Sequence, residues 1–348
     1  MAQYNYHRQS IASYLRRLYG DGLKKSIYLN DTQVQILLER IGIFKFKGYL
    51  YAFKPHIQNY SIDEVFVLFF FDKYLSRLLM DMTSSIETKL KSALIESAYK
   101  QLNSLPRKHP LKDNPFFYLI QSCYINPNPK LIGPSVNNWK NMLPVATVSE
   151  RYIHYGRYYQ SQYDFASNKA KYLDSLTTIP LQDSINYPPF HYFVEGSVLG
   201  TIIYLIKHLQ INNVAIMPHV ARKFGVTNPR IDFIPYLERL NEVRNRAAHR
   251  ERLFNRSYRS VTRFGKYRKL SQEIRDHGFM DVYLFLFFMM DSIDNYADFQ
   301  QFKHNEIEKL FEDFVEDYYI QRDSMYLTKK FKRDLCEKMR NFILGGMQ

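Results

Sequence analysis

The sequence predicts a mostly α-helical protein, and three observations support this fold class. Apolar residues recur at intervals of three and four over long stretches, which places them on one face of a helix. No pattern of alternating strands and helices is present, so a parallel sheet is not expected. Hydrophobic residues make up 46% and charged residues 24% of the 348 residues, which is a globular composition. A chain of this length can bury a core in one large domain or in two smaller ones.

The N-terminal part of the chain is expected to contain short helical and extended pieces. Asp31 and Thr32 can cap a helix over about Gln33–Arg40, which Gly42 then interrupts. The run Ile43–Phe53 begins by alternating apolar and polar residues, and this favours a short strand or an extended turn. Its lysines among aromatic residues could hold single-stranded nucleic acid, although core aromatics with solvated lysines are the simpler interpretation.

The strongest helical signal lies between residues 61 and 100. Ser61 and Asp63 can cap the start of this helix, and Glu87 and Lys91 can pair across one of its turns. Apolar residues recur at helical spacing over roughly nine turns. They are Leu68, Leu75, Leu79, Met82, Ile86, Leu90 and Leu94. One long helix that lines the core is therefore expected.

Residues 101–190 are expected to form an irregular insertion, because prolines interrupt them repeatedly. The tyrosines of residues 150–172 fit either a polar helix that contacts RNA or a partner chain, or ordinary helix boundaries. Helical patterns resume after Pro189, with a short helix over residues 214–225 and a longer one over Ile231–Ala248. Three more helices are expected near the end of the chain, over about residues 279–297, 299–320 and 327–343.

The formal net charge of +14 favours a polyanionic partner, either nucleic acid or an anionic membrane surface. The longest apolar runs are far shorter than the ~20 residues of a membrane-spanning helix, so no membrane span is expected. The N-terminus has no continuous apolar region of the signal-peptide kind. Cys123 and Cys336 lie too far apart in sequence to indicate a zinc site or a disulfide framework. A cytoplasmic location is expected.

Several common enzyme classes are excluded by the motifs that the sequence lacks. It has no glycine-rich phosphate loop, no His-Glu-x-x-His pair and no Gly-x-Ser-x-Gly turn. It also has no cysteine pair at metal-ligand spacing. We therefore expect neither a metal nor a cofactor.

The candidate site lies at the end of the helix expected over Ile231–Ala248. Asn245 and His249 are four residues apart and share a helix face, and Arg244 is long enough to reach towards them. RNA is cleaved without a metal when a 2′-hydroxyl attacks the adjacent phosphate, a near-neutral group moves protons and a fixed cation balances the phosphorane. Histidine and arginine suit these roles. The spacing alone also fits a surface helix end whose cations complement the helix dipole.

A strongly basic stretch follows this motif. Between Arg244 and Arg275 the sequence contains eleven basic residues, opposed only by Glu251 and Glu273. RNA-binding roles are expected for Arg256, Arg259, Arg263, Lys266, Arg268 and Lys269. One chain supplies only one histidine at the motif, so a two-fold dimer would provide both an acid and a base.

The motif and its flanks resemble the signature of the Abi (AbiD/AbiF-like) abortive-infection proteins, a branch of the HEPN ribonucleases. The matching residues are Leu240, Asn241, Arg244, Asn245, Ala248, His249, Arg252, Leu253, Phe254 and Asn255. Earlier pieces are also similar: Ile41-Gly42, Gly48-Tyr49, Phe53, Phe71-Asp72, Leu75, Leu78-Leu79 and Ile86-Glu87. Relatives commonly carry a second histidine where this chain has Arg250.

The resemblance implies an all-α, HEPN-type helical bundle over residues 61–348, with a small N-terminal elaboration over residues 1–60. It implies a metal-independent endoribonuclease of bacterial anti-phage defence, active as a homodimer with a composite site. The implied catalytic residues are Arg244, Asn245 and His249. Supporting roles are implied for Glu195, Arg246, Arg250, Arg252 and Asn255. Some relatives are held in check by a small structured RNA, as in a toxin–antitoxin pair, so a noncoding RNA is a candidate partner.

Two other functions fit the same residues. A non-catalytic protein could use the motif to hold RNA, with a small noncoding RNA as its partner. A phage sensor that contacts only other proteins would bind no RNA at all.

Overall fold

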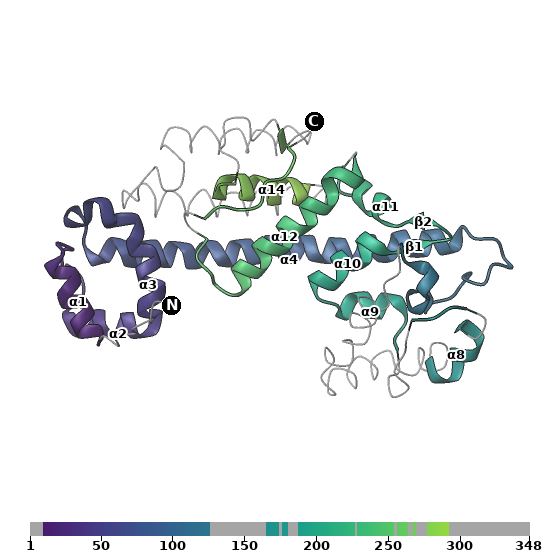
Figure 1. Cartoon of the computed structure of the whole chain (residues 1–348), viewed down its shortest axis with the longest axis horizontal. Coiled ribbons are helices and arrows are strands. Elements are labelled where there is room, and N and C mark those ends of the chain that lie inside the picture. The colour runs from purple at the N-terminus through teal and green to yellow at the C-terminus, as the bar shows by residue number, and fades with distance from the viewer. Residues whose placement is uncertain are drawn as a thin grey trace, which may run out of the picture. The chain divides into compact units, whose positions relative to one another are not determined.

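The computed structural model describes residues 10–125, 165–173, 176–179, 187–226, 228–253, 256–263, 267–268 and 277–291. These residues are mostly α-helical, as the sequence predicts, and their strands are limited to one short hairpin (Figure 1). They form two compact units, which we call unit 1 (residues 1–82 and 242–348) and unit 2 (residues 83–241). The predicted boundary near residue 60 does not coincide with this division, which falls inside two helices, α4 (Ile62–Asn103) and α12 (Ile234–Ala248).

Unit 1 begins with three helices and a 3-10 segment: α1 (Ile11–Gly20), α2 (Asp31–Ile41), α3 (Ile43–Leu50) and η1 (Tyr51–Asn59). A capping box starts α2, because Asn30 and Gln33 each accept the other's backbone N–H at 3.0 Å. The cap is therefore Asn30 and not the predicted Asp31-Thr32 pair. Gly42 ends α2 with a φ of 86°, which glycine adopts at low cost, and the predicted interruption is confirmed.

The run Ile43–Phe53 is helical, so the predicted strand or extended turn is wrong. Phe46, Tyr49 and Leu50 are buried at helical spacing. The ring of Phe46 packs edge-on against Tyr14 of α1, with 6.4 Å between the centroids. This packing of aromatic residues outweighs the local alternation that suggested a strand.

The predicted long helix is confirmed as α4. Ser61 caps it: the Glu64 carboxylate accepts the Ser61 backbone N–H at 2.8 Å, and the Ser61 hydroxyl accepts the Asp63 N–H at 3.2 Å. All seven of the predicted core positions from Leu68 to Leu94 are at most 2% exposed. The predicted pair of Lys91 and Glu87 forms at 3.3 Å.

The last described helix of unit 1 is α14 (Phe279–Asp291), and nearly all of its side chains that are described are buried. It confirms the described part of the helix predicted over residues 279–297. The helices predicted over residues 299–320 and 327–343 lie outside the described residues, as does most of the tyrosine-rich segment.

In unit 2, turns and the 3-10 segments η2 (Phe117–Leu119) and η3 (Gln121–Cys123) follow α4. The predicted insertion over residues 101–190 starts slightly too early, because α4 continues to Asn103, and α9 (Phe190–Gly196) begins at its last residue, Phe190. Between these two helices its described part is irregular except for one short helix, α8 (Phe165–Leu173). Cys123 is a buried free thiol, and burial raises its pKa to about 12. Two helices follow, α9 (Phe190–Gly196) and α10 (Leu199–His208).

A short antiparallel hairpin follows α10, with Gln210 paired to Ala215 and Ile211 to Val214. Its strands are β1 (Gln210–Ile211) and β2 (Val214–Ala215), and its turn residues Asn212 and Asn213 have φ values of 50° and 61°. Asparagine tolerates this left-handed conformation. The helix predicted over residues 214–225 is therefore shorter, and forms α11 (Met217–Arg222).

A single π-helical turn, η4 (Pro229–Phe233), leads into α12, so the predicted helix over Ile231–Ala248 is confirmed. Within the described ranges, every helix is too short or too polar to cross a lipid bilayer.

Candidate active site

The candidate site occupies the C-terminal end of α12, in unit 1. The helix closes with two hydrogen bonds of a Schellman motif, from Glu251 N–H to Arg246 O at 2.9 Å and from Arg250 N–H to Ala247 O at 3.0 Å. Arg250 takes the left-handed conformation that this motif requires, with φ of 50°. His249 is thus the residue at which the helix stops, immediately before a turn of fixed geometry.

Arg244 and Asn245 are half-buried, whereas His249 is exposed. The Arg244 guanidinium donates to the Asn245 side-chain oxygen at 3.2 Å. The backbone N–H of His249 donates to the Asn245 carbonyl at 2.9 Å, so this residue pair still belongs to the helical ladder. A hydrogen-bonded Arg–Asn pair and an accessible imidazole therefore lie within about one turn of the helix end.

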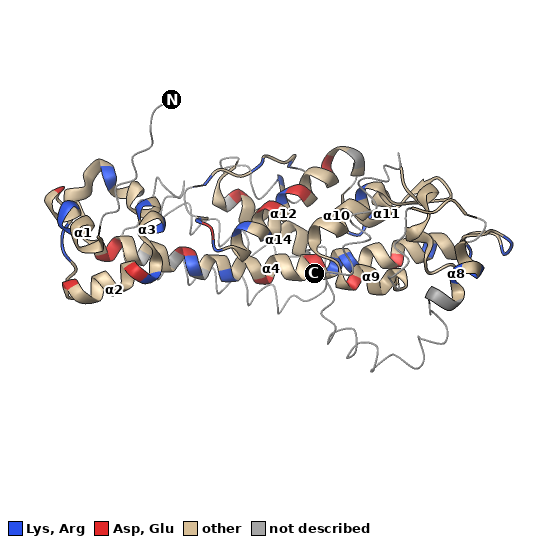
Figure 2. Cartoon of the chain, turned by 60° about the horizontal axis from the view of Figure 1, so that its bottom comes forward, with Lys and Arg blue, Asp and Glu red and all other residues tan. Residues whose placement is uncertain are grey.

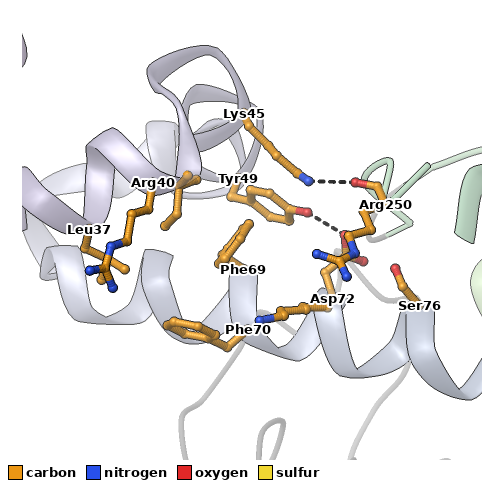
Figure 3. A pocket seen from close by; sticks show the side chains of 11 residues that line it. Leu37, Arg40, Lys45, Tyr49, Phe69, Phe70, Asp72, Ser76 and Arg250 are labelled. Atoms are coloured by element: carbon orange, nitrogen blue, oxygen red, sulfur yellow. Dashed lines mark hydrogen bonds between the residues drawn. The ribbon is translucent and has the colours of Figure 1, made fainter. Parts of the chain in front are cut away.

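Helix α3 fixes the turn that follows His249. The Lys45 ammonium donates to the Arg250 carbonyl at 2.7 Å, and the Arg252 guanidinium donates to the Gly48 carbonyl (Figure 3 shows the first contact). Both contacts join residues more than two hundred positions apart in the sequence. The backbone directly after His249 is thereby tied to α3 at two points.

A buried carboxylate of α4 makes the third attachment. Asp72 is 1% exposed; it accepts the Tyr49 hydroxyl at 2.5 Å and the backbone N–H of Leu253 at 3.1 and 3.0 Å, one distance to each oxygen. Burial raises the pKa of Tyr49, and the negative charge of Asp72 raises it further. A buried carboxylate is stable only when such donors surround it, so Asp72 holds α3, α4 and the segment after the motif together.

These anchoring roles are not predicted by the sequence pattern. Lys45, Gly48 and Tyr49 follow the i, i+3, i+4 spacing of one helix face, but the alternation at the start of the run that contains them favours an extended structure. Gly48, Tyr49 and Asp72 belong to the pieces that carry the resemblance stated above, although no role was attached to them. The helical spacing of these residues was the signal that could have found them.

Three of the predicted cations pack within the protein. Arg246 pairs with Glu242 at 2.7 Å and lies over the Tyr258 ring, 5.3 Å from its centroid. Arg252 is the residue bound to Gly48, as described above. Arg263 pairs with the buried Asp281 at 2.9 Å. These contacts help to hold the segment after α12 in place.

Other predicted cations lie at the surface. Arg250, Arg256, Arg259 and Arg268 are exposed. Lys and Arg residues recur on the helices of both units, interspersed with Asp and Glu (Figure 2). The predicted residues Asn255, Lys266 and Lys269 lie outside the described residues.

Glu195 belongs to unit 2 and is exposed. It lies near the end of α9. Its backbone carbonyl accepts a hydrogen bond from Lys91 at 3.1 Å. Across the described part of the chain, no three His, Cys, Asp or Glu side chains form a group that could hold a metal ion.

A family model described as "Abi-like protein" matches residues 36–255. The match starts within α2 and includes the motif, all three anchoring contacts and every described residue of unit 2. No curated protein and no solved structure gives a significant match to the chain.

Proposed function

The chain belongs to the family of Abi-like proteins, and from this premise we propose that it is a metal-independent endoribonuclease of bacterial anti-phage defence. One observation carries the proposal. The hydrogen-bonded pair of Arg244 and Asn245 lies about one turn from the exposed His249, on a helix end that three contacts hold in place. A fixed cation and an accessible imidazole are the two groups that metal-free RNA cleavage requires.

In the proposed reaction, the 2′-oxygen of one nucleotide forms a bond to the adjacent phosphorus. A histidine removes the 2′-hydroxyl proton, and the bond from phosphorus to the 5′-oxygen breaks. A second histidine gives a proton to the leaving 5′-oxygen, so the products are a 2′,3′-cyclic phosphate and a 5′-hydroxyl. Arg244 donates hydrogen bonds to the phosphorane oxygens, and Asn245 keeps its guanidinium oriented.

This scheme needs two copies of His249, one as base and one as acid, whereas each chain contributes one. We therefore propose a homodimer in which two α12 ends face one RNA strand. The exposed Arg250, Arg256 and Arg259 would bind the flanking phosphates. A small noncoding RNA is a candidate for holding the enzyme inactive by the same contacts.

The test is RNA cleavage by purified wild type and by His249→Ala, with His56→Ala as the matched control. His56 is also an exposed histidine of unit 1, and it lies on η1, outside the motif. We expect His249→Ala to lose at least about a hundredfold in cleavage rate while it still binds RNA, and His56→Ala to cleave normally. Cleavage should persist in EDTA and leave cyclic phosphate ends.

A non-catalytic RNA-binding protein is the second candidate, and the exposed arginines after α12 favour it as strongly as they favour an enzyme. It predicts RNA that copurifies with the wild type and no cleavage by any variant. Equal cleavage by wild type and His249→Ala would instead show that another site does the chemistry.

A further inference from the structure

Unit 1 contains a cavity of about 370 Å³ beside the turn that follows His249 (Figure 3). Helices α2, α3 and α4 supply its walls, and Arg250 closes one side. The volume lies in the range of roughly 300–1,000 Å³ that small-molecule sites occupy. Of the residues that line this cavity, the proposed function uses only Arg250.

The walls combine apolar surface with positive charge. The apolar lining residues are Leu37, Ile41, Phe69 and Phe70, and the cations are Arg40, Lys45, Lys73 and Arg250. The single carboxylate is Asp72, and both of its oxygens already accept hydrogen bonds. Four cations and one anion leave the lining with a formal charge of +3.

Most of these cations are not neutralised by the protein. Within the described residues, the side chains of Arg40, Lys73 and Arg250 form no hydrogen bond and no ion pair. Lys45 binds the Arg250 carbonyl and lies 5.7 Å from the centre of the Phe69 ring. Like charges gathered around one cavity repel one another, so an anionic ligand would be stabilising there.

The aromatic wall is held in a fixed orientation. Phe69 makes edge contacts with Tyr49 at 5.6 Å and with Phe70 at 5.4 Å between centroids. Both phenylalanines are half-buried, so they keep some accessible surface. Fixed, partly accessible rings of this kind favour a flat aromatic ligand by stacking or edge contact.

We infer that this cavity binds one nucleotide, with its base against Phe69 and Phe70 and its phosphate beside Lys73 and Arg250. An apolar wall with three available cations suits a group that joins a flat ring to a phosphate. The nucleotide is either one unit of an RNA strand or a free mononucleotide. The RNA source rests on the proposed function, whereas nucleotide binding itself does not.

The position of Arg250 would connect this pocket with the motif. Arg250 lines the cavity through its side chain, follows His249 directly, and has its carbonyl held by Lys45. A nucleotide bound by Arg250 would therefore lie beside the residue next to the proposed catalytic imidazole. For an RNA substrate, the pocket would select the base near the cleaved phosphate.

The first experiment measures binding of the four nucleoside 5′-monophosphates and of inorganic phosphate to the full-length protein by calorimetry. Lys73→Gln is the test variant, and Arg77→Gln is its control, since it removes the same charge from an exposed position one turn along α4. We expect at least one monophosphate to bind more tightly than inorganic phosphate, and Lys73→Gln to weaken it about tenfold while Arg77→Gln does not. Phe70→Ala should weaken the monophosphate more than inorganic phosphate.

The second experiment separates the two sources with a 2′-O-methyl oligonucleotide, which lacks the attacking hydroxyl and reports binding without cleavage. If Lys73→Gln weakens the oligonucleotide and the monophosphate competes with it, the pocket holds an RNA nucleotide. If only the monophosphate is affected, the ligand is a free nucleotide. Monophosphates that bind no better than phosphate, or binding that Lys73→Gln leaves unchanged, would overturn the inference. None of these readouts depends on RNA cleavage, so failure of the proposed function is detected separately.

Discussion

At the scale of single residues, Asp72 contributes most to the geometry of the site without belonging to the motif. Its carboxylate is buried, and it accepts one hydroxyl from α3 and one backbone N–H from the segment after α12. A buried charge that loses a donor costs far more than an exposed one, because water cannot replace the missing hydrogen bond. The conformation of residues 250–253 therefore depends on the donors of Asp72.

Replacing Tyr49 with Phe tests this dependence. The variant keeps the buried ring and removes only the hydroxyl that donates to Asp72, so we expect the free energy of unfolding to fall by about 1.5–3 kcal/mol. The matched control is Tyr51→Phe, because Tyr51 is 66% exposed on the neighbouring segment η1. Urea denaturation followed by circular dichroism gives both values. Equal midpoints for the two variants would show that the hydroxyl does not stabilise the fold.

At the scale of elements, α4 and α3 show what local sequence can predict. The forty-two residues of α4 contain neither Gly nor Pro, and their apolar spacing matches one face of a helix throughout, so the prediction was confirmed. α3 has only eight residues, and four of them, Phe44–Lys47, alternate between apolar and polar. Its helical state depends on packing of Phe46 and on contacts to residues about two hundred positions away, which a local pattern does not contain.

The end of α12 permits a test at the same scale, because glycine at Arg250 and glycine at Ala248 should change the free energy of unfolding in opposite directions. Arg250 occupies a left-handed position where a side chain costs about 1 kcal/mol, so Arg250→Gly should raise the free energy of unfolding by roughly 0.5–1 kcal/mol. Ala248 is the last helical residue, so Ala248→Gly should lower it by a similar amount. Thermal unfolding of both variants and of the wild type measures the two changes in the free energy of unfolding. A loss of stability in Arg250→Gly would mean that its side chain makes a stabilising contact that outweighs the backbone strain.

Arg250→Gly also separates stability from binding. It removes a cation from the pocket while the carbonyl that Lys45 binds remains. If the pocket binds a nucleotide, Arg250→Gly should bind monophosphates more weakly than the wild type although it is more stable. No general loss of folding could produce that combination.

At the scale of the whole molecule, the net charge of +14 and the motif could be recognised from the sequence, and they led to the proposal of an RNA substrate. The sequence does not reveal which arginines are available to RNA, because their availability depends on burial and on pairing within the fold. Arg263 and Arg256 both belong to the basic stretch after the motif, yet Arg263 pairs with the buried Asp281 and Arg256 is exposed. The pocket could not be predicted from the sequence either, because its lining residues lie within 37–76 and at Arg250 and come together only in the fold.

The composite site itself makes a quantitative prediction for mixtures of subunits. If both copies of His249 act on one phosphate, a dimer with one His249→Ala subunit is inactive. Cleavage should then follow the square of the wild-type fraction, so an equal mixture that has exchanged subunits retains about one quarter of the activity of undiluted wild type. Sites that work within one chain would instead retain about half. Differently tagged wild-type and His249→Ala chains, co-expressed at several ratios and assayed at constant total protein, distinguish the two curves. A linear curve would rule out the shared site while leaving the catalytic role of His249 intact.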